Sequence, residues 1–278
     1  MRQFLFASVA LLAVVGAETA RGADRPPEVI YPANYPAAPA LYPAATAPFT
    51  FTGFYAGASV GGVLGGTKFL ETPSGAFGPA AAWVAGVGTS STAPRGVIGG
   101  LEAGYNWQLG HFVLGIETDF SGWDMSSNSA MSAFGTPPPL LVPLLPPGNL
   151  MTYTSSGTVT SNWLYTLRPR VGFANGNMLT YLTAGLAVTN LRFSESITLG
   201  TGAPILAGST SSTVAGWTAG GGVEYALSWN WFIKAEYLYA SFSNQNAPQV
   251  VGAFPSLTGT ATANLNANIL RGGFDYRF

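Results

Sequence analysis

The last eleven residues of the chain, NILRGGFDYRF, constrain its fold more than any other stretch. Apolar and charged side chains alternate along it, which is the period-2 pattern of a strand with two different faces. One face holds Leu270, Phe274, Tyr276 and Phe278, and the other holds Arg271, Asp275 and Arg277. A soluble protein would turn the charged face to water. We predict the reverse, in which the apolar face meets lipid and the charges point into a closed barrel.

The composition of the chain favours a membrane protein over a soluble enzyme. Of its 278 residues 47% are hydrophobic and only 8% are charged, whereas about a quarter are charged in a typical soluble domain. The formal net charge of −1 gives no electrostatic reason to expect a nucleic acid as a partner. The sequence has no cysteine, which excludes disulfides, thiolate nucleophiles and cysteine metal ligands.

The N-terminus has the pattern of a secretory signal. Arg2 precedes the apolar run 4–17, and small residues follow, so we predict a signal peptide over residues 1–22 with cleavage before Ala23. The run is too short to span a membrane as a helix, and no later stretch reaches about 18 unbroken apolar residues. Because only helices and closed barrels satisfy their backbone hydrogen bonds in a bilayer, an integral protein of this kind must be a barrel. We therefore predict export to the outer membrane of a Gram-negative cell.

Two regions follow the signal peptide. Residues 23–50 are rich in Pro, Ala and Tyr and predict an extended, polyproline-like periplasmic leader. A spacer is the simpler interpretation, and a docking segment for a periplasmic partner or the cell wall is the alternative. Residues 51–278 form the predicted barrel domain.

Eight alternating segments predict the strands of this barrel. They lie at residues 52–62, 96–108, 112–120, 163–173, 178–189, 215–225, 231–239 and 268–278. Three connections are tight (109–111, 174–177 and 228–230), and four are long. The predicted fold class is therefore all-β: an eight-stranded antiparallel up-and-down transmembrane β-barrel with short periplasmic turns and four long extracellular loops.

Two residues in these strands lead to further expectations. Pro169 cannot donate to a neighbouring strand, so a bulge or local irregularity is expected there. Trp123 is expected to join an aromatic girdle near the long loops. The other members of that girdle are Trp163, Trp217 and Tyr239.

Eleven charged residues fall on the predicted inward faces. The acids are Glu102, Glu117, Asp119, Glu224, Glu236 and Asp275, and the bases are Arg168, Arg170, Lys234, Arg271 and Arg277. Eight strands enclose a space just wide enough for side chains, and buried ions must be partnered. We interpret these residues as a charged structural network that fills the lumen, with a narrow passive channel as the alternative. Six other charges are assigned to the long loops: Lys68, Glu71, Arg95, Asp124, Arg192 and Glu195.

The sequence offers little for catalysis. Its one histidine, His111, lies in a predicted periplasmic turn, so we expect no enzymatic activity, metal site or cofactor. The loop run PPPLLVPLLPPG, residues 137–148, is apolar and broken by proline. It is expected to be a stiff cover over the barrel mouth or, alternatively, an exposed patch for adhesion.

Several segments together resemble a known family. They are FTGFYAGASVGG (51–62), GGLEAGYNWQLGHFVLGIETDFSGW (99–123), LRPRVGFANGNMLTYLTAGLAV (167–188), GWTAGGGVEYALSWNWFIKAEYLYASF (216–242) and the terminal RGGFDYRF. They resemble the small outer-membrane barrels of alphaproteobacteria, the RopB-like and outer-membrane immunogenic protein group, related to opacity-type porins.

The resemblance implies an abundant surface protein that contributes to envelope integrity and host contact. It implies as partners outer-membrane lipid and lipopolysaccharide, the barrel-assembly machinery, and a host-surface ligand bound through the loops. The terminal FDYRF resembles the signal read by that machinery, with Phe274, Tyr276 and Phe278 at its aromatic and apolar positions.

Some members of this group are described as porins or as haemin-binding, so a haem or other ligand receptor is a further alternative. No histidine lies in a predicted external loop, so haem would have to be ligated by tyrosine or methionine. The candidates are Tyr153, Met125, Met131 and Met151.

Overall fold

The computed structural model describes residues 49–135, 151–200, 204–251 and 254–278. The predicted signal peptide, nearly all of the predicted leader and the proline-rich run 137–148 lie outside the described residues. Within those residues, no helix is long and apolar enough to cross a membrane.

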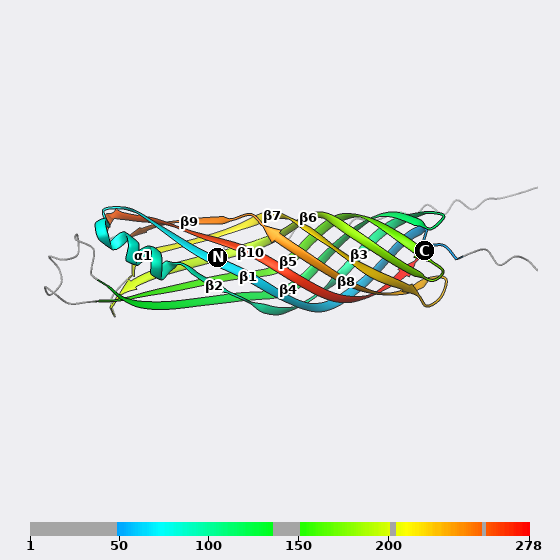
Figure 1. The fold of residues 1–278 in the computed structure, drawn as a ribbon, viewed down its shortest axis with the longest axis horizontal. Coiled ribbons are helices and arrows are strands. Elements are labelled where there is room, and N and C mark those ends of the chain that lie inside the picture. The colour runs from blue at the N-terminus through cyan, green and yellow to red at the C-terminus, as the bar shows by residue number, and fades with distance from the viewer. Residues whose placement is uncertain (1–48, 136–150, 201–203, 252–253) are drawn as a thin grey trace, which may run out of the picture. The chain divides into compact units, whose positions relative to one another are not determined.

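Eight long antiparallel strands form a closed ring (Figure 1). In ring order they are β1 (Gly53–Gly75), β3 (Arg95–Leu109), β4 (Phe112–Gly135), β5 (Met151–Asn175), β6 (Met178–Leu199), β7 (Pro204–Ala226), β8 (Trp231–Phe242) and β10 (Phe254–Arg277). The ring closes where β1 pairs with β10, in one unbroken register from Tyr55–Arg277 to Gly75–Leu257. The predicted fold class is confirmed.

Three tight turns connect neighbouring strands at one end of the ring, which we call the turn end. They lie between β3 and β4, between β5 and β6, and between β7 and β8, as the sequence predicted. Gly110 and Gly176 have φ angles of +65° and +58°, a backbone conformation that favours glycine over residues with a Cβ. The opposite end, where the predicted long loops lie, we call the loop end.

The strands continue well past their predicted ends toward the loop end. β4 runs on to Gly135 and β6 to Leu199, and the segment between β6 and β7 is only 200–203. Much of what the sequence predicted as loops is therefore a wall, the loop-end extension. We define it as residues 64–75, 123–135, 151–162, 190–199, 204–214 and 254–266.

The loop-end extension reverses the polarity of the wall, which explains why the sequence prediction ended its strands too early. Near the turn end of β6, Leu182 and Leu186 are exposed and face outward. Farther along the same strand Phe193 and Ile197 are buried inside, while Arg192 is exposed. The side-chain alternation is continuous, but the apolar side chains change face, as expected where the surroundings change from lipid to water.

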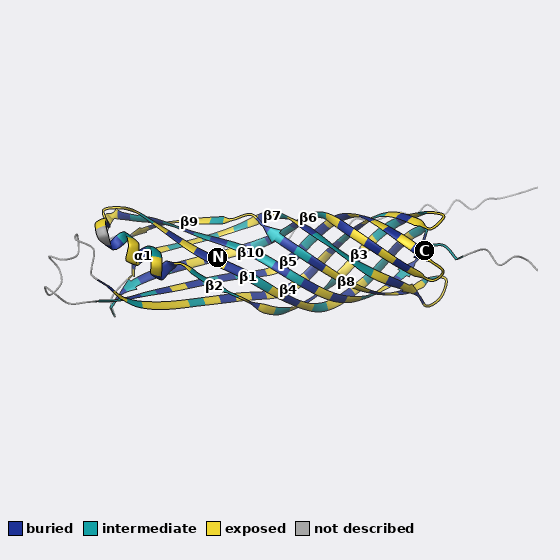
Figure 2. Cartoon of the chain, viewed as in Figure 1, coloured by how far each residue is buried: buried dark blue, intermediate teal, exposed yellow. Residues whose placement is uncertain are grey.

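Exposed apolar side chains lie around the turn-end half of the ring, and we call this set the apolar belt. Figure 2 shows the exposed residues on the strands of this half in yellow. Its members include Phe54, Val60, Val97, Leu101, Leu114, Ile116, Leu182, Ile233, Leu270 and Phe274. Trp123 does not join an aromatic girdle outside the barrel, because it points inward, is 4% exposed and donates from Nε1 to Ser161 Oγ at 2.8 Å. The prediction for Trp123 was wrong, since the alternation that begins at Phe112 carries residue 123 to the inner face.

Pro169 interrupts the ladder without the predicted bulge. β5 and β6 pair in the same register on both sides of Pro169, at Leu167–Leu186 and at Arg170–Thr183. Between these two positions the strands have no paired residues. Thr183 Oγ1 donates to the Pro169 carbonyl at 2.9 Å across this gap. The irregularity is a short gap in the pairing, and the register shift in this strand lies instead between Thr160 and Leu164.

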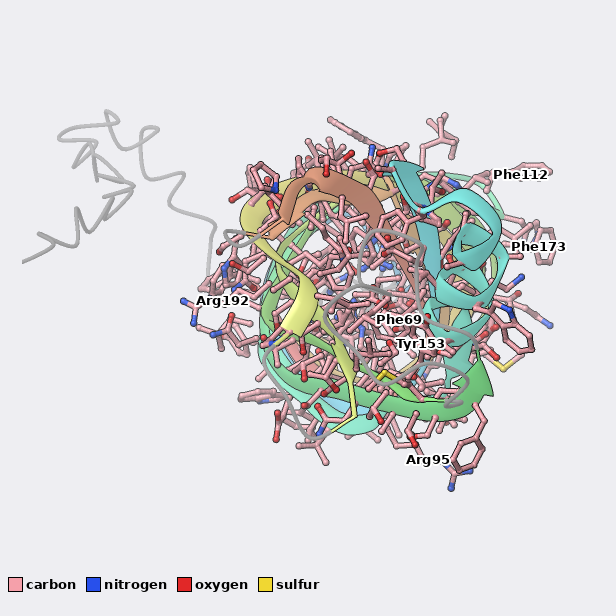
Figure 3. All side chains as sticks on the ribbon, turned by 90° about the vertical axis from the view of Figure 1, so that its left-hand side faces the viewer. Phe69, Arg95, Phe112, Tyr153, Phe173 and Arg192 are labelled. Atoms are coloured by element: carbon pink, nitrogen blue, oxygen red, sulfur yellow. The ribbon has the colours of Figure 1, made fainter. Side chains whose placement is uncertain are left out.

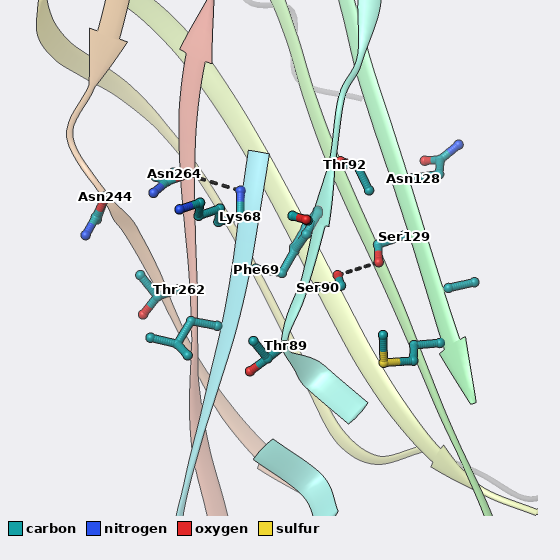
Figure 4. Close-up of a pocket in the computed structure, with 14 residues that line it drawn as sticks. Lys68, Phe69, Thr89, Ser90, Thr92, Asn128, Ser129, Asn244, Thr262 and Asn264 are labelled. Carbon is teal, nitrogen blue, oxygen red and sulfur yellow. Dashed lines mark hydrogen bonds between the residues drawn. The ribbon is translucent and has the colours of Figure 1, made fainter. Parts of the chain in front are cut away.

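Two short strands complete the loop-end wall without joining the ring on both sides. β2 (Ser90–Thr92) pairs with β1, and β9 (Gln245–Val251) pairs with β10. Toward β4, the Ser90 and Ser129 hydroxyls lie 2.5 Å apart (Figure 4). Thr92 also contacts Ser127 on β4. Across the other seam, from β7 to β9, the Ser212 hydroxyl donates to Gln245. These two seams are joined by side chains where the described residues show no backbone ladder.

A short helix covers the loop end of the lumen. The 3₁₀ turn η1 (Gly78–Ala80) leads into α1 (Ala81–Gly88), and Phe77, Val84 and Val87 pack against apolar side chains that point inward from the strands. The helix has no polar face to expose into the lumen, which fits its position as an apolar cover.

We expect Leu101→Arg to lower the free energy of unfolding by about 2–4 kcal/mol, because it puts a charge in the apolar belt. Leu101 is 71% exposed, and its matched control Leu70, in the loop-end extension, is 52% exposed. Leu70→Arg should change stability by less than about 0.5 kcal/mol. Urea unfolding in lipid vesicles measures both values, and equal costs would contradict the position of the belt.

Candidate functional site in the barrel interior

All eleven charged residues predicted to face inward are buried, at 8% exposure or less. Nine of them meet in one ion-pair network: Glu102 on β3, Glu117 and Asp119 on β4, Arg168 and Arg170 on β5, Glu224 on β7, Lys234 and Glu236 on β8, and Arg271 on β10. Six of the eight strands contribute, so the network connects the wall across the lumen.

Glu117 is the centre of this network. Its carboxylate lies 2.6 Å from Arg168, 3.1 Å from Lys234, 3.3 Å from Arg170 and 3.7 Å from Arg271. A buried carboxylate surrounded by four cations is stabilised in its charged form, whereas a bare one would cost several kcal/mol.

Two arginines extend the network to the other acids. Arg168, fully buried, lies 3.0 Å from both Asp119 and Glu236. Arg271 lies 2.6 Å from Glu236 and 3.2 Å from Asp119. Each guanidinium thus bridges carboxylates from different strands, which uses the several donors of arginine in a way that lysine could not.

Hydroxyl and amide groups that the sequence prediction did not single out complete the network. Tyr55 donates to Glu117 at 2.7 Å, and Tyr181 donates to Glu236 at 3.0 Å. Asn106 Oδ1 accepts from Arg170 Nε at 2.9 Å. Their parity could have identified them, because each lies on the inward face of a predicted strand.

Glycines make the room for these long side chains. A Cβ at Gly115 would lie 3.0 Å from Arg170 Cγ, and one at Gly273 would lie 3.0 Å from Lys234 Cε. The small lumen of an eight-stranded barrel can hold nine charged side chains only because neighbouring inward positions are this small.

Asp275 and Arg277 are buried, but neither makes an ion pair with any described residue. Asp275 lies beside Glu102 and Lys234 of the network. Arg277 donates to the Trp229 carbonyl at 2.5 Å and lies over the rings of Phe49 and Phe232, at the turn end. The structure thus joins nine of the predicted residues by ion pairs, with Asp275 next to them and Arg277 apart.

Apolar layers fill the lumen on both sides of the network. Toward the turn end, Phe51, Val113 and Phe232 belong to one buried cluster. Toward the loop end, Phe69 and Phe193 belong to a second one. A third cluster under α1 includes Tyr153, which Figure 3 shows inside the barrel together with Phe69.

Comparisons with known proteins agree with this architecture. Residues 37–278 match the family described as outer membrane protein beta-barrel domain. The chain belongs to this family. It is an outer-membrane β-barrel protein, and the family resemblance of its sequence motifs is confirmed.

The relatives of this outer-membrane barrel include proteins of Brucella and Rhizobium. The chain is 31% identical over 245 residues to the 31 kDa outer-membrane immunogenic protein of Brucella melitensis, with 87% of this chain and 89% of the relative covered. It is 28% identical over 158 residues to the 22 kDa outer membrane protein of Rhizobium leguminosarum bv. viciae, with 56% and 57% covered.

Two solved structures show a distant likeness to the chain. Ail, the attachment invasion locus protein of Yersinia pestis, has 14% identity and a TM-score of 0.33, covering 82% of this chain and 99% of that one. Neisserial surface protein A has 16% identity and a TM-score of 0.34, covering 82% and 98%.

The residues considered for haem ligation are not gathered at the surface of this barrel. Tyr153 and Met125 are buried at 0% and 2% exposure, whereas Met131 is 40% exposed. Met151 packs partly buried against the cluster under α1. Among the described residues there is also no group of three or more His, Asp or Glu side chains arranged to hold a metal.

Two acids that the sequence assigned to loops are in fact inside the barrel. Glu71 on β1 and Glu195 on β6 are 2% and 3% exposed, so their assignment to loops was wrong. The other four loop charges, Lys68, Arg95, Asp124 and Arg192, are exposed. Continued alternation was the available signal, since Phe69 and Glu71 share the parity of the inward Tyr55.

We expect Arg168→Met to lower the free energy of unfolding by about 3–5 kcal/mol, because it leaves buried carboxylates without their partner. Arg192→Met is the matched control, since Arg192 is exposed, and it should change stability little. Unfolding by urea in detergent micelles measures both. Similar costs for the two variants would contradict a structural role for the network.

Proposed function

We propose that this protein is a sealed, non-enzymatic outer-membrane barrel that contributes to envelope integrity and to contact with surfaces through its loop-end extension. The observation that carries this proposal is the filled interior. A charged network and three apolar clusters follow one another along the lumen. Among the described residues, no continuous aqueous path therefore passes through these layers.

The ion pairs themselves argue against conduction. A passing ion would have to separate contacts such as Arg168–Glu117 at 2.6 Å and Lys234–Glu102 at 2.6 Å. Each separation would leave a buried charge unpaired, which costs several kcal/mol. Rings of charge in conducting pores instead face water and remain available to the ion.

The outer surface suggests which partners the barrel meets in its membrane. The apolar belt fits the hydrocarbon layer, and the belt residue Phe274 packs at 4.8 Å, between ring centres, against Trp231. Lys68, Arg95 and Arg192 are exposed beyond the belt, and Figure 3 shows Arg95 and Arg192 pointing away from the barrel. We propose that these basic residues contact the phosphate groups of lipopolysaccharide, because such contacts are favourable beside an anionic surface.

The C-terminal strand supports a further proposed partner, the barrel-assembly machinery. Phe278 is 77% exposed, and Tyr276 packs between Phe278 and Trp231 at 5.1 and 4.8 Å between ring centres. Together with Phe274 these side chains form an outward aromatic edge at the strand that closes the ring. A host-surface ligand would bind at the loop-end extension, whose outward side chains are mostly polar.

The sealed lumen is tested in planar bilayers. Purified protein should insert without reproducible conductance steps, because no water-filled path crosses the layers of the lumen. The lumen is also filled where Gly57 lies against Asp275. A porin of known conductance serves as the positive control for the bilayer measurement. Discrete steps at constant amplitude would overturn the proposal in favour of a narrow passive channel.

Deletion of Phe278 tests the assembly signal. We expect the amount of inserted barrel in cells to fall several-fold, while the stability of protein refolded in detergent changes little. Phe54→Ala is the matched control, since Phe54 is a 66% exposed aromatic residue of the neighbouring strand. Equal losses in cells for both variants would contradict a specific role for the terminal residue.

A further inference from the structure

A polar layer lies between two apolar layers inside the loop-end extension. Glu71 comes from β1, Glu195 from β6 and Gln249 from β9, and their exposures are 2%, 3% and 0%. On the turn-end side Phe69 packs on Phe193 with ring centres 5.8 Å apart. On the loop-end side lies the apolar cluster under α1, which includes Ile197, Leu206 and Leu257.

The three side chains converge on a small volume. A Cβ at Gly88 would lie 2.8 Å from Glu71 Cγ and 3.3 Å from Glu195 Oε1. A Cβ at Gly259 would lie 2.5 Å from Glu71 Oε1 and 3.3 Å from Gln249 Oε1. The carboxylates and the amide therefore lie so close to these two glycines that a side chain at either position would not fit beside them.

Most polar atoms of this layer lack partners. Five of them make no aligned hydrogen bond with a described residue. These are both carboxylate oxygens of Glu71, Oε2 of Glu195 and both polar atoms of the Gln249 amide. Only Glu195 Oε1 accepts one, from Ser155 Oγ at 3.1 Å. Buried polar groups are normally hydrogen-bonded, so a cluster of five unpartnered atoms, an amide among them, indicates a missing ligand.

No cation from the described chain neutralises the two carboxylates. Neither Glu71 nor Glu195 forms an ion pair with a described residue, and the neighbouring bases Lys68 and Arg192 are exposed on the outer face. The internal segments 136–150, 201–203 and 252–253 contain no charged residue. The charged network near the turn end shows the opposite situation, with each of its acids in an ion pair.

We propose that Glu71, Glu195 and Gln249 form a calcium-binding site, with Ser155 Oγ as a further oxygen ligand. Carboxylate, amide and hydroxyl oxygens are the ligands that Ca²⁺ prefers, and two carboxylates match its charge. Ca²⁺ also tolerates irregular geometry and takes six to eight oxygens, which bidentate carboxylates and water can supply, whereas Mg²⁺ requires a near-ideal octahedron.

A groove on the outer wall lies beside this layer. It has a volume of about 600 Å³, and its lining includes Glu195, Gly208 and Pro248. Among the described residues, β7 and β9 beside it are not paired by a backbone ladder.

A bound ion would join three strands of the wall that do not pair with one another. β1, β6 and β9 would each supply a ligand, and β9 pairs with a neighbour on one side only. The site would therefore stabilise the loop-end extension, in the way a cross-link does, and at the seam where backbone pairing is missing.

The test measures thermal unfolding of the full barrel in detergent at pH 8, with CaCl₂ or with a chelator. Saturating Ca²⁺ should raise the midpoint by roughly 5–10 °C, because an ion that binds only the folded state stabilises it.

Two variants make the result specific. Glu71→Gln combined with Glu195→Gln keeps the side-chain shape and removes both charges, so this protein should fold and lose the response to Ca²⁺. Asp124→Asn, which alters an exposed acid, should keep this response. An absent calcium effect in the wild-type protein at pH 8, or an equal effect in the double variant, would overturn the proposal. An equal effect of MgCl₂ would overturn the choice of Ca²⁺.

Discussion

The closure of the ring by β1 and β10 is the constraint on which the rest of this structure depends. Inside a bilayer no water is available for an unpaired backbone edge, so the first and last strands of the ring must pair over their whole membrane length. Their unbroken register from Tyr55–Arg277 to Gly75–Leu257 meets this requirement. Once the ring is closed with eight strands, the width of the lumen is determined, and charged side chains from opposite walls can reach one another.

The interior follows from that width. Glu117 can touch four cations from β5, β8 and β10 because the lumen is narrow and because glycines occupy nearby inward positions. Charges that would be costly alone are partnered by neighbours distant in sequence. The polar layer at Glu71 and Glu195 lacks such bases. Within one barrel, the paired charges therefore form a structural network, whereas the unpaired carboxylates form the proposed ligand site.

The change of polarity along each strand explains where the sequence prediction succeeded and where it failed. In the membrane half, Leu182 and Leu186 face outward and the charges face inward, so strand positions and the tight turns were predicted well. In the loop-end extension the apolar side chains Phe193 and Ile197 face inward, as in a water-soluble sheet. A prediction that expects apolar side chains outside interprets this change as the end of a strand, and for the same reason it places Glu71 and Glu195 in loops.

The sequence by itself determined the strand count, the three tight turns, and which face of each membrane strand carries charge, because these properties depend on local periodicity and turn residues. Only the tertiary structure decided which charges pair, that Asp275 and Arg277 make no ion pair with a described residue, and that Glu71, Glu195 and Gln249 converge. These outcomes depend on the register of all eight strands around the ring. The odd or even position of a residue in its strand indicates which face it occupies. Its position along the lumen and its partner on the opposite wall are determined only when the barrel closes.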